Sequence, residues 1–208
     1  MQITNRGVTS FPLIWRRERL IAILNAVPTA DRVRRQPSLF SRHKAFRVEC
    51  RGSLGHGTAV FHSACHSLMH WKMFNVGWLR LVAPAPEPQV GHSYGIACCV
   101  LGICAVSVAN VAQIRVVEND ERIRLTIVCR ATQFHMLIGS ETFTVVLDRS
   151  SQESQYRIRS RSWVAPLFRP LTVFVRYTQR RFASASCEAM QRAVSSDTIV
   201  DLGNVQCR

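Results

Sequence analysis

The chain has 208 residues, long enough for a single domain with a substantial hydrophobic core. Its 27 Lys and Arg residues outnumber 13 Asp and Glu residues, and the net charge of +14 raises the question of an anionic partner. Eight cysteines would suit a small secreted disulfide protein, but no signal-peptide pattern opens the chain and no Cys-x-x-Cys pair occurs. We therefore expect reduced thiols, a cytoplasmic protein, and neither a metal site nor a cofactor.

The basic residues concentrate near the two ends of the chain. Residues 1–51 carry eleven Arg and Lys against three acids, residues 52–156 carry seven of each, and residues 157–192 carry eight Arg against one Glu. RNP-type, zinc-finger and recognition-helix signatures are missing, which argues against a nucleic-acid partner. A solvated basic surface is the simpler interpretation.

The first 43 residues differ from the rest of the chain. Arg-rich segments, prolines and the lack of a sustained period predict a short helix near Leu13 to Asn25 and then a loose connector. We treat residues 1–43 as an extension that is partly helical or disordered, and place the main domain at residues 44–194. That domain begins with a strand, AFRVEC, and a Gly-rich turn, RGSLGHG, that leads into a helix.

The segment from Gly57 to Leu81 has the pattern of an amphipathic helix that ends near Asn75 to Gly77 and leads into the strand GWLRLVAP. Thr58 is the expected N-cap. The buried stripe has the spacing i, i+3, i+4, i+7 and consists of Phe61, Ala64, Cys65 and Leu68. A ladder of histidines, which could chelate a metal ion but falls on the opposite and therefore solvated side, consists of His62, His66 and His70.

The segment from Pro88 to Ile114 contains no charged residue and is long enough to cross a bilayer. Its β-forming residues and its polar interruptions instead favour two buried antiparallel strands that meet near Leu101 and Gly102. Both interpretations stay open at this point, with the membrane one disfavoured.

Two further hairpins follow in the sequence, and a helix closes the domain. Alternating strands flank a turn at Glu118 to Glu121, and a second pair flanks Arg149 to Glu153, for a meander of about six or seven strands. A helix from about Pro166 to Val194 has a predicted buried face of Leu167, Leu171, Phe174 and Phe182, and an opposite stripe of Arg169, Arg176 and Arg180. Residues 195–208 have a turn-like composition and are expected to be a frayed tail.

Three runs in this order resemble the DUF1990 family, also called UPF0548, from about Ala45 to Val194. They are GTAVFHSACHSLMHWKMFNVGWLRL, HMLIGSETFTVVLD and YRIRSRSWVAPLFRPLTVFVRYTQRRFASASCEAMQRAV. The resemblance implies an α+β helix-grip fold like that of the Bet v 1 and START-like superfamily, in which a curved antiparallel sheet surrounds a long C-terminal helix and leaves a cavity. It implies no activity, because the family is one of unknown function.

The hairpin of this chain departs from the family pattern. His135, Gly139, Glu141 and Phe143 match it, whereas residues 129–133, Cys-Arg-Ala-Thr-Gln, stand where the family has Tyr-Gly-Thr-Leu-Pro. If the family's function depends on this loop, it is altered or lost in this chain.

These observations leave two principal functions and a weaker third. The first is a binding module for a small apolar ligand, with the pocket lined by Trp78, Tyr94, Phe143 and Phe174. The second is an enzyme that uses the same cavity, with His135 and Glu141 as an acid–base pair. The third is a basic protein that binds an anionic surface or nucleic acid through the arginine stripe of the last helix. The sequence indicates no particular oligomeric state.

Overall fold

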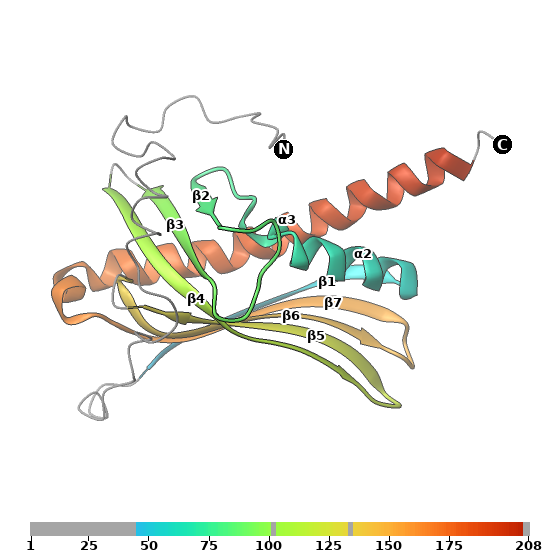
Figure 1. Cartoon of the computed structure of the whole chain (residues 1–208), viewed down its shortest axis with the longest axis horizontal. Helices are drawn as coiled ribbons and strands as arrows, with labels where there is room; N and C mark the ends of the chain where they lie inside the picture. The colour runs from blue at the N-terminus through green and yellow to red at the C-terminus, as the bar shows by residue number, and fades with distance from the viewer. Residues whose placement is uncertain (1–44, 101–102, 133–134, 206–208) are drawn as a thin grey trace.

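The computed structural model describes residues 45–100, 103–132 and 135–205, which form a curved sheet with helices on one side (Figure 1). The predictions for residues 1–43 therefore lie outside the described residues. The strands are β1 (Phe46–His56), β2 (Leu79–Val82), β3 (Ser93–Val100), β4 (Ile103–Glu118), β5 (Arg122–Ala131), β6 (Leu137–Asp148) and β7 (Glu153–Val164). The helices are α2 (Thr58–Met69) and α3 (Thr172–Val205), with short 3₁₀ helices η3 (Lys72–Phe74) and η4 (Pro166–Leu171).

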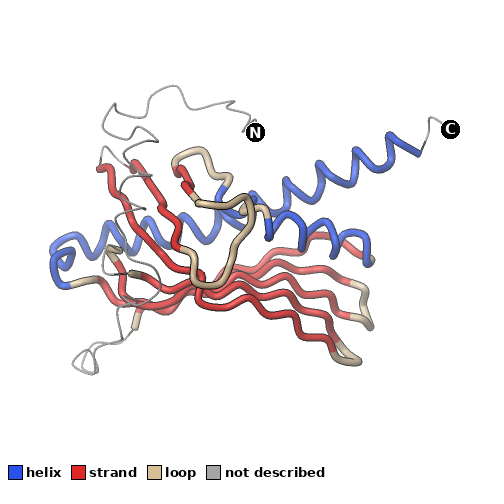
Figure 2. The backbone as a smooth tube through the Cα atoms, in the orientation of Figure 1, coloured by secondary structure: helices blue, strands red, loops and turns tan. Residues whose placement is uncertain are grey.

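All seven strands belong to one antiparallel sheet in the order β1-β7-β6-β5-β4-β3-β2. Both α-helices lie on the inner side of its curve, and α3 runs along most of the length of the molecule (Figure 2). The predicted α+β helix-grip fold is confirmed. The strands have alternating burial, so that Leu125, Ile127 and Cys129 of β5 are buried while Arg124 and Arg130 are exposed.

The uncharged segment from Pro88 to Ile114 forms strand rather than a membrane helix. β3 pairs with β4 from Ser93 opposite Asn110 to Val100 opposite Ile103, as the two-strand interpretation predicts. Within the described part of the chain, no helix has the length and the apolar character needed to cross a bilayer.

The core lies between α2, α3 and the sheet, and an aromatic cluster is at its centre. Phe74 stacks on Phe182 with ring centroids 5.3 Å apart and also contacts Tyr94 at 5.7 Å and Phe143 at 5.6 Å. Trp71 lies 4.8 Å from Tyr94. Each of these rings is at most 7% exposed, so the cluster anchors the helices to the sheet.

The boundaries of the first helix differ from the prediction. β1 continues through the Gly-rich run to His56, and Gly57, with φ 92°, is the N-cap in place of Thr58. The Gly57 N–H donates to the Gln152 carbonyl at 2.8 Å, which fixes the helix start against the β6–β7 turn. The helix ends at Met69 because Trp71 adopts a left-handed conformation with φ 59°.

The predicted buried face of the last helix was wrong at its start. Leu167 is 84% exposed and Leu171 is 41% exposed. Pro166 and Pro170 lie in η4, whose 3₁₀ turns have a shorter period than an α-helix, so the 3.6-residue stripe does not extend back into this segment. Within α3 the buried residues include Val175, Phe182, Ala183, Cys187, Met190 and Val194.

The last helix also continues into the predicted tail. α3 runs to Val205, past the expected end at Val194. The Ser195 and Ser196 hydroxyls donate to the carbonyls of Gln191 and Arg192, one turn earlier, so these serines fit within a helix. The turn-like composition was therefore a poor guide to the structure of residues 195–205.

Candidate functional site

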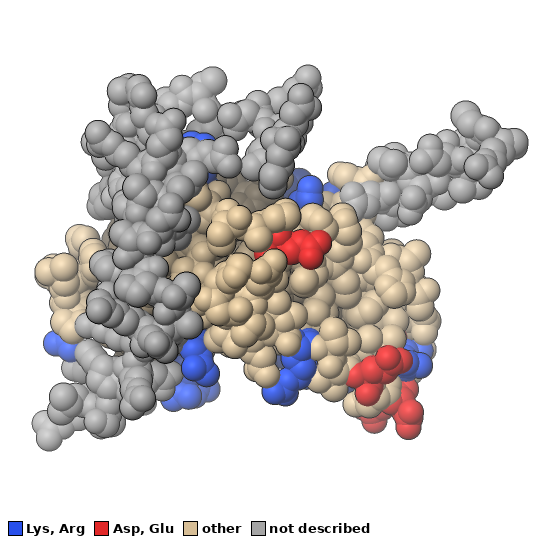
Figure 3. Space-filling model, in the orientation of Figure 1, with Lys and Arg blue, Asp and Glu red and all other residues tan. Residues whose placement is uncertain are grey.

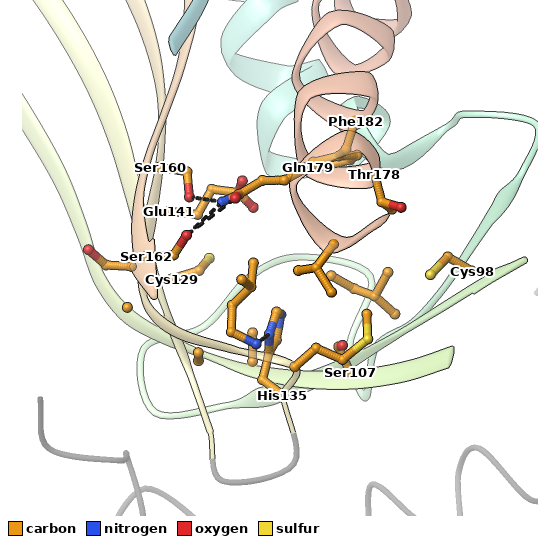
Figure 4. Close-up of a pocket in the computed structure, with 18 of the residues that line it drawn as sticks. Cys98, Ser107, Cys129, His135, Glu141, Ser160, Ser162, Thr178, Gln179 and Phe182 are labelled. Atoms are coloured by element: carbon orange, nitrogen blue, oxygen red, sulfur yellow. Dashed lines mark hydrogen bonds between the residues drawn. The ribbon is translucent and has the colours of Figure 1, made fainter. Parts of the chain in front are cut away.

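A pocket of about 110 Å³ lies between the first turns of α3 and the inner face of the sheet (Figure 4). Its helical wall has the spacing i, i+3, i+4, i+7 and consists of Val175, Thr178, Gln179 and Phe182. Strands β2 to β7 and the segment before β6 complete the wall, with apolar residues that include Trp78, Leu79, Ile96, Ala109, Met136 and Leu137. The pocket is thus formed by segments from most of the domain.

Two of the four predicted ligand-binding aromatics line this pocket. Tyr94 is 1% exposed, and Trp78 forms part of the wall with the Arg181 guanidinium 5.0 Å from its ring centre. Phe143 and Phe174 do not line it. Phe143 packs in the core against Phe74, and Phe174 lies one position before Val175, about 100° around the helix.

An acidic side chain lies in the sheet wall of the pocket. Glu141 on β6 is aligned with Cys129 on β5 and with Ser160 on β7, so all three side chains face inward. None of the described residues donates a hydrogen bond to the Glu141 carboxyl group or forms an ion pair with it. Burial away from water disfavours the charged carboxylate and raises the pKa of Glu141 to about 8, so the group is protonated at neutral pH.

A hydroxyl and a thiol lie beside this carboxyl group. The Tyr94 hydroxyl and the Cys129 thiol interact with one another. Burial raises the pKa of Cys129 to about 12 and raises that of Tyr94 well above its ordinary value, so both groups stay protonated. Such a thiol is a poor nucleophile, because the thiolate is the reactive form.

His135 also reaches the pocket but is not joined to Glu141. The Leu137 N–H donates to His135 Nδ1 at 3.0 Å, and burial lowers the pKa of the imidazole to about 4. The ring is therefore neutral, with its proton on Nε2. His135 and Glu141 extend from different parts of the wall, and Glu141 lies near Gln179 (Figure 4). The structure brings the predicted acid–base pair into one pocket without bringing the two groups into contact.

A polar network that the sequence analysis missed links α3 to the sheet. The Gln179 amide donates to the Ser160 hydroxyl and, at 3.1 Å, to the Ser162 hydroxyl (Figure 4). All three residues are buried. The signal available in the sequence was the alternation in YRIRSRSW, which places these two serines on the face opposite to the arginines.

Gly139 permits the close approach of β6 to β7 at the wall of the pocket. Its φ is 150°, and a Cβ built there would lie 2.1 Å from the Arg161 carbonyl oxygen. A side chain at this position would push the two strands apart. The match of Gly139 to the family pattern therefore has a steric explanation.

The remaining predicted sites lie outside the pocket. His62 and His66 are exposed on α2, and His70 Nδ1 hydrogen-bonds the His66 carbonyl at 2.9 Å. No group of three or more His, Cys, Asp or Glu among the described residues could hold a metal ion. In the arginine stripe, the Arg176 and Arg180 guanidinium groups lie over the Phe46 ring, at 5.1 and 5.2 Å from its centre.

Solved structures with a similar arrangement have little sequence in common with this chain. The hypothetical protein jhp0584 of Helicobacter pylori is 12% identical, with a TM-score of 0.48, and the match covers 80% of this chain and 98% of that one. The protein TTHA0849 of Thermus thermophilus is 10% identical, with a TM-score of 0.47, over 73% of this chain and 99% of that one.

The sequence comparisons agree on one family. A UPF0548 protein of Dictyostelium discoideum is 25% identical over 195 residues, which are 88% of this chain and 89% of the relative. The model of the family described as "Domain of unknown function (DUF1990)" matches residues 29–189, a match that starts before the Ala45 boundary suggested by the sequence patterns. Because this match covers most of the chain, the protein belongs to the DUF1990 family.

Proposed function

We propose that the pocket binds a small, uncharged and mostly apolar molecule. The observation that carries this proposal is that four titratable groups inside the pocket are all neutral at pH 7. The pKa of Glu141 is raised to about 8 and that of His135 is lowered to about 4, while Cys129 and Tyr94 keep their protons. Among the described lining residues, Arg130 is the one that carries a charge, and its side chain turns away from the pocket into solvent. A charged ligand would therefore lose its hydration without gaining an opposite charge inside the pocket.

The polar groups of the pocket favour a ligand with a hydrogen-bond acceptor. Protonated Glu141 has an O–H that no described residue accepts, and the neighbouring amide and hydroxyls of Gln179 and Ser160 bond to each other. A carbonyl or ether oxygen on the ligand would satisfy this donor. Since an apolar cavity of roughly 150 Å³ can hold benzene, a pocket of about 110 Å³ suits a small ring or the end of a longer molecule.

Binding is favoured over catalysis because the predicted acid–base pair is not assembled. The Nδ1 atom of His135 accepts a hydrogen bond from the backbone, and no described contact joins this ring to Glu141. An enzyme remains the alternative function, and it would depend on Glu141 as a lone proton donor with a pKa near the working pH.

The test uses two valines on α3 and two ligands of similar size. Val175 lines the pocket and is 2% exposed, whereas Val173 is 83% exposed. We expect calorimetry to detect binding of acetophenone but not of benzoate, and we expect Val175→Phe to abolish this binding while Val173→Phe leaves it intact. Equal or tighter binding of benzoate, or equal effects of the two substitutions, would contradict the proposal.

Native mass spectrometry of protein isolated without a detergent wash identifies a resident ligand. We expect a neutral organic molecule on the wild type that is lost from Val175→Phe. Glu141→Gln separates the two functions. A binding protein keeps its bound ligand, because the glutamine amide is also neutral, whereas an enzyme keeps the ligand but no longer converts it. Turnover of the identified ligand that disappears in Glu141→Gln would favour the enzyme.

A further inference from the structure

The outer face of the sheet carries a second feature, a group of arginines that point away from the interior of the domain. Because side chains alternate along a strand, the inward positions of β7 are Tyr156, Ile158 and Ser160, and the outward positions are Arg157, Arg159 and Arg161. The same alternation turns Arg47 of β1 and Arg130 of β5 outward, and both are exposed. We call these five residues, Arg47, Arg130, Arg157, Arg159 and Arg161, the arginine face.

The strand register places these arginines in rows across the sheet. Arg47 pairs with Arg161, Arg161 pairs with Ser140, and Ser140 pairs with Arg130, so one row crosses four strands. Neighbouring strands lie about 4.8 Å apart, which places three guanidinium groups on a line of roughly 15 Å. In the next row, Arg159 lies beside Thr142. The rows thus combine guanidinium forks with hydroxyl groups, and both donate hydrogen bonds to phosphate oxygens.

The described acidic residues do not neutralise this face. Among them, Glu49 is the one carboxylate that contacts it, and it is already shared by Arg51, Arg157 and Arg159. No described carboxylate contacts Arg47, Arg130 or Arg161. Like charges directly opposite one another destabilise a sheet, so the pairing of Arg47 with Arg161 has a cost that a bound anion would remove.

Two arginines at the hairpin end of the sheet are paired with acids. Arg122 bonds Asp148 at 3.3 Å, and Arg149 bonds Glu118 at the same end of the sheet. In Figure 3, one of the two visible groups of acidic side chains lies at the lower right, while Lys and Arg side chains project at several points along the lower edge of the molecule. Arg115 and Arg124 are also exposed without a described carboxylate partner, but they do not belong to the row of Arg47, Arg161 and Arg130.

We propose that the arginine face binds the phosphate backbone of single-stranded nucleic acid. The face is on the convex side of the sheet (Figure 1), which a flexible strand can follow but a planar bilayer touches only along a line. The large hydrophobic side chains that are exposed include Val117 at the hairpin end of the sheet and Leu167 and Val173 beyond β7, all outside the rows of arginines. Beside these rows, Trp163 is only partly exposed, and its ring lies 5.5 Å from the Arg161 guanidinium. The arginine face therefore offers little apolar surface to insert into lipid. Arginine forks and hydroxyls contact phosphate and not base edges, so binding without base preference is expected, in keeping with the missing base-reading motifs.

The test measures the salt dependence of binding to a fluorescein-labelled 20-residue oligouridylate. The test variant is Arg47→Gln/Arg130→Gln/Arg161→Gln. The control, Arg122→Gln/Arg149→Gln/Arg192→Gln, removes the same charge from arginines paired with Asp148, Glu118 and Glu188. Three lost phosphate contacts should lower the slope of log K against log salt by about 2. We expect this loss in the test variant and a smaller change in the control.

A charge-preserving variant and other anionic ligands serve as further controls. The variant Arg47→Lys/Arg130→Lys/Arg161→Lys keeps the charge and should keep most of the slope, and circular dichroism melts confirm that each variant is folded. Equal slopes in the test and control variants would overturn the proposal. So would binding to polyglutamate or to phosphatidylserine vesicles that is as tight as binding to the oligonucleotide, because the face would then recognise any negative charge. Oligoadenylate should bind about as well as oligouridylate.

Discussion

The protonated carboxyl group of Glu141 should make the stability of the protein depend on pH in a way that a substitution can isolate. Its pKa in the folded protein is about 8, against an ordinary value of 4.5. Between these values the folded state holds a proton that the unfolded state releases, so the free energy of unfolding falls as pH rises. The contribution is fully present below pH 4.5 and is lost by pH 8. Glu141→Gln removes this titration and retains a neutral side chain of similar shape.

The magnitude follows from the two pKa values. Integration of the linkage relation from pH 5 to pH 7 gives a loss of about 2.5 kcal/mol for Glu141, an upper value because the side chain is only half-buried and solvent screens part of the effect. His135 acts in the opposite direction. Its pKa is about 4 against an ordinary 6.5, so its contribution is present above pH 6.5 and is lost as pH falls towards 4. Over the same interval this amounts to a gain of about 1.8 kcal/mol.

The two effects nearly cancel in the wild type, and single variants should separate them. Urea unfolding followed by tryptophan fluorescence at pH 5, 6 and 7 should give a nearly flat wild type, a Glu141→Gln variant that becomes more stable with pH, and a His135→Asn variant that becomes less stable. Asparagine keeps an acceptor for the Leu137 N–H. Parallel curves for the wild type and Glu141→Gln would show that Glu141 ionises normally and that the pocket is not uncharged at pH 7.

Two further substitutions test the sheet. Gly139→Ala places a methyl group against the Arg161 carbonyl and should destabilise the protein by about 3 kcal/mol or more. The control, Gly77→Ala, adds a methyl group that would meet nothing within 4 Å and should change the unfolding free energy by less than about 0.5 kcal/mol. Thermal melts that are alike for the two variants would be evidence against the steric role of Gly139. Glu49→Gln removes the negative charge and one of the two acceptor oxygens that three arginines share, and should cost about 1 kcal/mol at low salt. This effect is expected to shrink in 1 M NaCl, and a loss of stability that salt does not change would indicate a packing defect instead.

The strands could be predicted because their signals are local. Alternation in β5 and β7, with acidic and polar turns between the hairpin arms, fixes which residues face inward. Helix boundaries depend on contacts that a local pattern does not contain. Trp71 adopts its left-handed conformation while packed against Phe74 and Tyr94, and Gly57 is held by a carbonyl from a distant turn.

The pocket was harder to predict than the fold. Trp78, Tyr94, His135 and Glu141 were identified as site residues and do line the pocket, but aromatic character alone also selected Phe143 and Phe174, which do not line it. The polar residues of the wall were missed because their inward position is stabilised by partners on another element, as Ser160 is by Gln179. The rotation of α3 about its axis decides that Val175 and not Phe174 faces the pocket. This rotation depends on how the helix packs on the sheet and not on the helix sequence alone.

The position of β1 at one edge of the sheet has a consequence for synthesis of the protein. Among the described strands its neighbour is β7, and Phe46 near its start pairs with Ser162 near the end of that last strand. At ribosomal rates, the first strand must wait on the order of ten seconds before its partner emerges. Until then its unpaired backbone is open to pairing with other nascent chains. Alternate Arg and Glu side chains on this strand, Arg47, Glu49 and Arg51, are suited to keep it soluble during that delay.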